Sequence, residues 1–258
     1  MTENEKKEDS QKKPDPGVFL TKGMQINIPE FSIRISPDGN IDATPLILHT
    51  TIDLCPYWLE IAYDHLRCTE DASEQLLNAK KEQNDERIAD ALKAEFTEGM
   101  QTIMASAVAM DAFYANVKER IAIPDDLIQT WRKNGTARYK QIAEVLRRAF
   151  LMSEDSAKQI RVILKHNFGF RDKAVHPPTG TTAPTLHSEL NKVTDWRYVT
   201  FRYYNAKAIA GLTLSIITQT AMHPKNKHEG LKTYCETLSQ QLAPLISRWE
   251  ARYGKLFG

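Results

Sequence analysis

The hydrophobic pattern changes its period at Asp53, and this change constrains the fold more than any other feature of the sequence. Upstream, apolar and polar residues alternate over Met24–Ile28 and again over Phe31–Ile35, as they do in strands. Downstream, apolar residues recur at the spacing of one helix face. The sequence therefore predicts a small β hairpin or meander over residues 18–50 and a mainly α, helical bundle over residues 51–258.

The first half of the helical region is dominated by one long segment. Thr69–Ala72 is a candidate break before a helix over Ser73–Arg120. The middle of that segment, Ala79–Arg87, is almost wholly polar, which is typical either of a solvated helix or of a break. Its end, Ile103–Val117, is rich in Ala and Met on nearly all sides and should form the most buried helix.

Start and stop signals locate the remaining helices, for a total of about six. Pro124 and the acids after it suit a helix N-terminus, and Asn134-Gly135 ends that short helix. Pro244 indicates a kink or a boundary in the last helix. The other expected helices are Tyr139–Met152, a helix capped by Ser153 that ends near Asn167, Glu189–Met222 and Leu231–Tyr253.

Charge and composition exclude several classes of protein. The 34 basic and 33 acidic residues leave a net charge of +1, so any contact with RNA or DNA has to come from a local basic patch. Because no run of about 18 apolar residues occurs, we expect no membrane-spanning segment. Residues 1–17 are charged and lack an apolar core, which favours a disordered tail and excludes a signal peptide or transit helix.

The cysteines and histidines give no sign of a metal or disulfide framework. Cys55, Cys68 and Cys235 are odd in number and lack paired spacing, which favours the reducing cytoplasm. His223 and His228 flank a Lys-rich turn without a nearby Cys, which makes a poor metal site. The sequence has no Gly-x-Ser-x-Gly motif and no Gly-rich phosphate loop. We therefore expect a cytoplasmic protein with no metal and no cofactor.

The one stretch that suggests chemistry is Arg171-Asp172-Lys173-Ala174-Val175-His176-Pro177. The Arg-x4-His spacing alone is weak, because Arg161 and His166 show it too, in the middle of an amphipathic helical pattern. The later copy differs in its context, with an Asp after the Arg and a double proline after the His. His titrates near neutrality, as acid–base catalysis requires, and the planar donors of Arg suit a phosphate.

Helical geometry constrains how this motif can work. Positions five apart in an ideal helix lie about 140° apart around the axis and about 7.5 Å apart along it. Arg171 and His176 would therefore not share one face. Either Gly169 and the prolines distort this turn, or the site is completed across the two-fold axis of a homodimer.

The stretch resembles the motif of the HEPN superfamily, the higher eukaryote and prokaryote nucleotide-binding domain, in which Arg, a polar residue, three further residues and His follow one another. Ser106–Asn116 is similar to the Ala-rich first core helix of many HEPN proteins. The resemblance covers about residues 95–222 and implies a helical bundle that dimerises with its two motifs face to face. In active members it implies metal-independent RNA cleavage, with His176 acting on the ribose 2′-hydroxyl or on the leaving oxygen and Arg171 stabilising the phosphate. Other members bind nucleotides or mediate dimerisation without catalysis.

Each motif residue also has a purely structural interpretation. Arg171 can pair with Asp172 or another acid, and His176 can cap a helix C-terminus. Asp172 either orients the Arg or the His or occupies a solvated helix position. Asp111 and Asn116 either line the cleft or form satisfied buried hydrogen bonds.

A second candidate surface follows the motif. The segment Asp195–Tyr204 mixes Arg with aromatic residues, a composition that suits single-stranded RNA. Arg197 and Arg202, with Lys173 from the motif, are the candidate RNA contacts. Alternatively, the aromatic residues of this segment face the core. The sequence thus predicts a HEPN-like homodimer with an RNA or nucleotide ligand, either an endoribonuclease or a non-catalytic binding and interaction module.

Overall fold

The structure is a computed structural model, and the chain divides into two compact units, Met1–Ile52 and Asp53–Gly258. The disordered tail predicted at residues 1–17 lies outside the residues that the structure describes. These are residues 19–21, 23–28, 30–44, 48–225 and 228–256.

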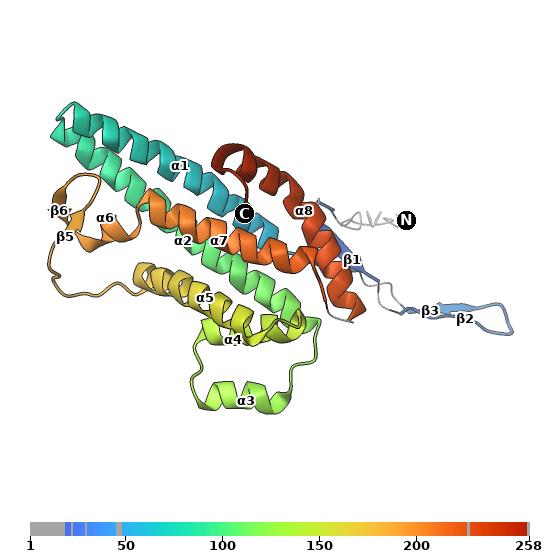
Figure 1. The fold of residues 1–258 in the computed structure, drawn as a ribbon. Coiled ribbons are helices and arrows are strands. Elements are labelled where there is room, and N and C mark those ends of the chain that lie inside the picture. Colours follow the sequence, from blue (N-terminus) through green and yellow to red (C-terminus); the bar gives the residue numbers. More distant parts are fainter. Residues whose placement is uncertain (1–18, 22, 29, 45–47, 226–227, 257–258) are drawn as a thin grey trace, which may run out of the picture. The chain divides into compact units, whose positions relative to one another are not determined.

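The first unit contains two antiparallel strand pairs. Gly39, at φ +84°, lies in the turn between the inner two strands, where an L side chain would be strained. The prediction of a small N-terminal β hairpin is confirmed, although its last strand extends beyond residue 50 to Ile52. The pairs are β1 (Met24–Asn27) with β4 (His49–Ile52) and β2 (Ile33–Ile35) with β3 (Ile41–Ala43) (Figure 1).

The second unit is helical, which confirms the predicted mainly α class. In the part of the chain that the structure describes it contains eight helices and one short hairpin. The helices are α1 (Cys55–Lys81), α2 (Asp85–Glu119), α3 (Asp125–Lys133), α4 (Arg138–Ala149), α5 (Glu154–Val175), α6 (Trp196–Thr200), α7 (Tyr203–Met222) and α8 (Glu229–Tyr253), and the hairpin strands are β5 (Thr185–His187) and β6 (Lys192–Thr194).

The helices α1 and α2 form a long hairpin whose turn lies in the polar stretch of the sequence. Gln83 has a left-handed φ of +55°, and the side chain of Asn84 accepts a hydrogen bond from the backbone N–H of Arg87 to start α2. The expected break at Thr69–Ala72 is wrong. Thr69, Ala72 and Ser73 are buried, so packing carries the helix through this segment, and the Thr69 hydroxyl is satisfied within it by donating to the His65 carbonyl at 2.7 Å.

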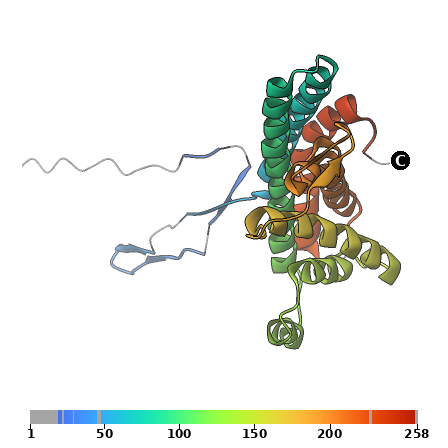
Figure 2. The same ribbon diagram turned by 90° about the vertical axis from the view of Figure 1, so that its left-hand side faces the viewer.

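The other helices pack around this hairpin (Figures 1 and 2). α7 contacts both α1 and α2, α8 covers α7 and α1, and α4 and α5 pack against α2. α3 lies outermost, below α4 in both views, and reaches the core through Trp131 and Leu127. The predicted Ala-rich segment of α2 is indeed buried, with Ile103, Met110 and Phe113 all fully inaccessible. None of the helices among the described residues has the length and apolar character needed to cross a bilayer.

The junction between α6 and α7 packs closely on α2. A Cβ at Gly99 would lie 1.8 Å from the Phe201 carbonyl oxygen, so only glycine fits there. Glu95 is 2% exposed, and its Oε1 accepts a hydrogen bond from the Tyr203 N–H at 2.9 Å, at the start of α7. Burial raises the pKa of the Glu95 carboxyl above its usual value.

Two predicted helix boundaries are wrong. The helix expected from Glu189 begins only at Tyr203, because Asn191 turns the chain with φ +53° between β5 and β6, and Asp195 caps the separate helix α6. The helix expected to end near Asn167 continues to Val175, because further apolar residues on the same face pack on the core. The second extension matters for function, since it incorporates the Arg–His stretch into α5.

Candidate functional site

The Arg–His stretch forms the last turn of α5. Arg171 lies inside the helix, and His176 follows directly as the C-cap residue. The His176 N–H donates to the Asp172 carbonyl at 2.7 Å, so helical hydrogen bonding persists to the end of the motif. Of the proposed distortion by Gly169 and the prolines, the part at Gly169 is wrong, since α5 continues through it, whereas the backbone does leave helical geometry at His176, just before Pro177. Positions five apart in an ideal helix lie about 140° apart around its axis, but His176, at φ −126° and ψ +59°, has already left helical geometry.

The guanidinium of Arg171 is held by two carboxylates and one ring. Its Nε and Nη2 donate to Asp172 Oδ1 at 3.0 and 2.7 Å. Its Nη1 lies 3.6 Å from Asp111 Oδ2 on α2, and the group stands 4.8 Å from the centre of the Phe168 ring. With 28% of its side chain exposed, Arg171 is oriented but still reachable from solvent.

Asp111 also holds a second arginine. Arg138, the first residue of α4, donates through Nε to Asp111 Oδ1 at 2.6 Å and stacks 4.1 Å from the centre of the Tyr114 ring. We call these five residues (Asp111, Tyr114, Arg138, Arg171 and Asp172) the Asp111 cluster. Burial raises the pKa of Tyr114, which favours the neutral phenol beneath the guanidinium.

Arg138 was not among the sequence candidates. In the sequence it stands just before the helix predicted at Tyr139–Met152, and only the packing of α4 against α2 brings it to Asp111. Its position before a helix gave no signal that could have identified it.

A cationic and aromatic group forms on another side of α5. The ammonium of Lys173 lies 5.4 Å from the Phe170 ring centre and 5.9 Å from that of Trp196 on α6. The guanidinium of Arg197 lies 4.9 Å from the same Trp196 ring, and its Nη1 donates to Asp195 at 2.8 Å. Two of the three expected RNA contacts, Lys173 and Arg197, therefore both lie against the ring of Trp196.

The third expected RNA contact and one expected cleft residue lie elsewhere. Arg202 Nη1 donates to both carboxylate oxygens of Glu189 at 3.0 Å and ties the β5–β6 turn to the start of α7. The Nδ2 of Asn116 donates to Asp53 Oδ1 at 3.1 Å, and Arg120 donates back to the Asn116 Oδ1 at the same distance. Asn116 is thus part of a structural network near the start of α1, apart from the Asp111 cluster.

An apolar groove adjoins the end of the motif. Ala174 and Val175 from α5 line it together with Trp58 from α1 and Met100 and Met104 from α2, and its volume is about 300 Å³. Val175 leaves 49% of its surface exposed. His176, itself exposed, follows directly on this apolar surface.

The arrangement offers a positioned guanidinium and an exposed imidazole without a metal. Over the residues that the structure describes, no group of three or more His, Cys, Asp or Glu side chains is placed to hold a metal ion. The Arg can stabilise an anion, and an imidazole can accept or donate a proton. Comparisons with protein-family models, with curated proteins and with solved structures give no match to this chain.

Proposed function

We propose that this chain is a HEPN-like, metal-independent RNA endonuclease that works as a cytoplasmic homodimer. The observation that carries the proposal is the last turn of α5, where Arg171 is oriented by Asp111 and Asp172 while His176 is exposed at the C-cap of the helix. Because positions five apart in a helix point to different sides, the proposal gives each site its Arg from one protomer and its His from the other.

The roles of the two residues follow from their chemistry. His176 removes the proton of the ribose 2′-hydroxyl or protonates the leaving 5′-oxygen, and Arg171 stabilises the charge that grows on the phosphate. Attack by the 2′-oxygen on the adjacent phosphorus expels the 5′-oxygen and leaves a cyclic phosphate. Asp111 and Asp172 keep the guanidinium in one orientation, which removes an entropic cost from the reaction.

The apolar groove supports the dimer. Its lining of Trp58, Met100, Met104 and Val175 is partly open and adjoins His176. A second copy that covers this groove would bury apolar surface and bring its own α5 next to the motif, as an isologous contact requires. Lys173 and Arg197, with Trp196 between them, would then contact the flanking RNA.

The proposal is tested by RNA cleavage in EDTA. Wild-type protein should cleave RNA and leave cyclic phosphate ends, whereas His176→Ala should lose the activity. The matched control is His166→Ala, which removes an exposed histidine in the middle of the same helix and should retain activity. No cleavage by the wild type, or equal cleavage by wild type and His176→Ala, would rule out the nuclease.

A second function is favoured by the ion pairs of Arg171. Its guanidinium already faces two carboxylates, Asp172 and Asp111, which compete with a phosphate for the same donors. A non-catalytic HEPN-like module that dimerises or binds a nucleotide needs no free Arg. Such a module would form the dimer and bind a nucleotide, but RNA would remain intact at every protein concentration.

A further inference from the structure

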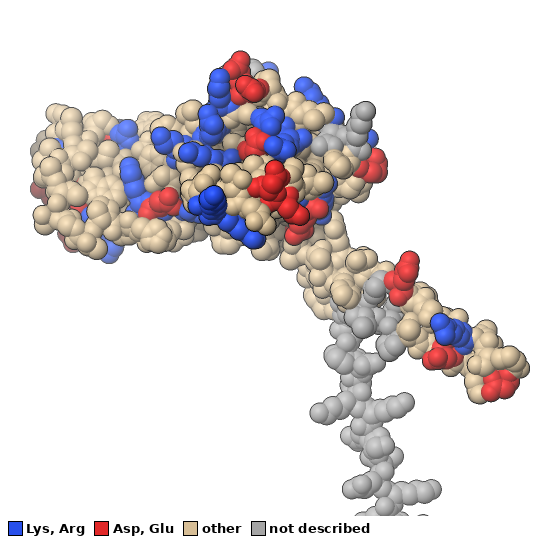
Figure 3. Space-filling view, turned by 90° about the horizontal axis from the view of Figure 1, so that it is seen from below, with Lys and Arg blue, Asp and Glu red and all other residues tan. Residues whose placement is uncertain are grey.

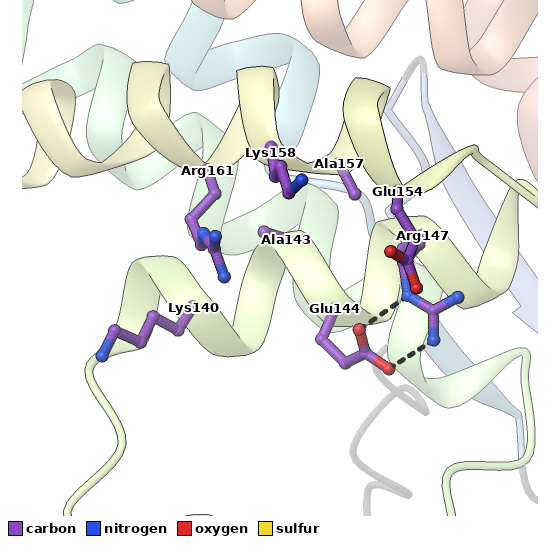
Figure 4. A pocket seen from close by; sticks show the side chains of 8 residues that line it. All are labelled: Lys140, Ala143, Glu144, Arg147, Glu154, Ala157, Lys158 and Arg161. Carbon is purple, nitrogen blue, oxygen red and sulfur yellow. Dashed lines mark hydrogen bonds and ion pairs between the residues drawn. The ribbon is translucent and has the colours of Figure 1, made fainter.

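The helices α4 and α5 enclose a groove that the Arg–His motif does not use. They are joined by a short turn and lie side by side, and the groove between them has a volume of about 300 Å³ (Figure 4). Each helix contributes four residues at the same i, i+3, i+4, i+7 spacing, within Lys140–Arg147 on α4 and Glu154–Arg161 on α5. The i+3 residue is Ala on both, Ala143 and Ala157, which leaves the space open.

At one end of the α4–α5 groove the charges are compensated. Glu144 accepts two hydrogen bonds from Arg147, both at 2.8 Å, and one from Arg148 at 2.6 Å. The hydrogen bond from Arg147 lowers the pKa of Glu144, so this carboxylate is ionised and is engaged by three arginine hydrogen bonds. It has little capacity left to neutralise a cation farther along the groove.

At the other end the cations are not compensated. Figure 4 shows Arg161 reaching from α5 into the space above α4, with Lys158 beside it and Lys140 at the rim. Within the described part of the chain, the side chain of neither Arg161 nor Lys140 forms a hydrogen bond or an ion pair. Lys158 meets only Asp155, at 3.6 Å and largely in solvent. Like charges gathered in a groove repel one another until an anion joins them.

The residues that line the α4–α5 groove favour a compact anion with several oxygens. Lys and Arg gather with acidic residues over the middle of the face seen in Figure 3, whereas its left-hand end is mostly uncharged. The residues that line the α4–α5 groove include no aromatic side chain on which a base could stack and no apolar residue other than the two alanines. Its donors suit a compact group with several acceptor oxygens.

We propose that the α4–α5 groove is a phosphate-binding subsite in which Arg161 forks onto the phosphate while Lys158 and Lys140 neutralise it. The phosphate belongs either to the backbone of a polynucleotide or to a free phosphate ion. The subsite does not depend on the proposed cleavage, because none of its residues belongs to the Asp111 cluster.

The test measures the binding of two probes to the full chain. Inorganic phosphate is titrated by calorimetry, and a short oligouridylate is titrated by fluorescence anisotropy at several salt concentrations, with His176→Ala present in every protein so that the RNA stays intact. Arg161→Gln should weaken binding about tenfold, as expected for one lost charge-assisted hydrogen bond. For the RNA it should also lower the salt slope by about 0.7.

Two further variants make the result interpretable. Arg67→Gln makes the same chemical change on the exposed face of α1 and should leave phosphate binding unchanged. Lys140→Glu should place a carboxylate opposite Arg161, abolish binding and raise the melting temperature, which shows that the protein is folded. An effect on both probes identifies a general phosphate site, and an effect on the RNA alone identifies a backbone subsite. If Arg161→Gln and Lys140→Glu bind both probes as tightly as Arg67→Gln, the proposal is wrong.

Discussion

Replacing Gly169 by alanine tests the geometry of the motif helix. Gly169 is exposed within α5, and a Cβ added there would meet nothing within 4 Å. A glycine in a regular helix costs about 0.5–1 kcal/mol relative to alanine, because the unfolded chain has more freedom to lose. We therefore expect Gly169→Ala to stabilise the protein by about this amount and to raise the melting temperature by roughly 1–4 °C.

The same substitution at Gly99 provides the contrasting case. Its Cβ would lie 1.8 Å from the oxygen and 3.0 Å from the carbon of the Phe201 carbonyl, and backbone cannot rotate away as a side chain can. Overpacking of this kind typically costs roughly 1–3 kcal/mol. Gly99→Ala should accordingly lower the melting temperature by several degrees.

Thermal and urea unfolding of the two variants, followed by circular dichroism, give both numbers. RNA cleavage by Gly169→Ala should equal that of the wild type, because α5 already continues as a helix through Gly169 to Val175. A loss of stability in Gly169→Ala would show that α5 is not regular at this point. A gain of stability with a loss of cleavage would show that the active site requires a bend there, and the two-chain site would lose its geometric basis.

Two further substitutions follow from the ion pairs and the buried acid. Asp111→Asn should lower stability by about 1 kcal/mol, since it removes partly exposed ion pairs with Arg138 and Arg171. It should also slow RNA cleavage roughly ten- to a hundredfold, because the Arg171 guanidinium is then misplaced. An unchanged cleavage rate would contradict the orienting role of Asp111. The pKa of Glu95 in the folded chain is raised above 4.5. Above pH 4.5 the folded state therefore binds more protons at this carboxyl than the unfolded state does. As the pH rises towards the folded pKa, the carboxyl lowers the stability of the protein. Glu95→Gln, which can still accept from the Tyr203 N–H, should therefore gain stability over the wild type as the pH increases from 4.5 to 8; an advantage in urea unfolding that shrinks with pH would refute the assignment.

The fold class could be predicted because the hydrophobic period differs on the two sides of Asp53. The helix boundaries were predicted less well, and the reasons are local. Thr69 looked like a breaker, but it is fully buried in the packed face of α1, where its hydroxyl bonds to the His65 carbonyl. The last turns of α5 lie beyond the end expected near Asn167, because the neighbouring Phe168 is buried and carries the helix onward. In both places tertiary packing overrides the local preference of one residue.

The candidate site shows the same division between local and long-range information. The contact between Arg171 and Asp172 is local and could be foreseen as one of two interpretations. Asp111 and Asn116 lie five positions apart on one helix, so they face different sides by the same 140° rule that applies to the motif. On α2 this rule explains why Asp111 lies beside Arg171 whereas Asn116 does not. The role of Arg138 had no such local signal.

The dimer prediction also has a measurable physical basis. The partly open apolar groove beside Val175 is small for an interface, and a stable dimer typically buries about 800 Å² on each partner. The contact would have to extend over the neighbouring faces of α1, α2 and α5. In sedimentation experiments the wild type should form a dimer, and Val175→Asp should form a dimer that dissociates more readily. A wild type that is monomeric at all concentrations would contradict the two-chain site.

The most direct test of that site mixes two inactive proteins. Arg171→Gln and His176→Ala chains are co-expressed so that dimers form at random. If each site takes its Arg from one chain and its His from the other, half of the dimers carry one intact site of two, and the mixture should recover about a quarter of wild-type RNA cleavage. If the mixture remains as inactive as either variant alone, although mixed dimers are present, the Arg–His site is not shared between two chains.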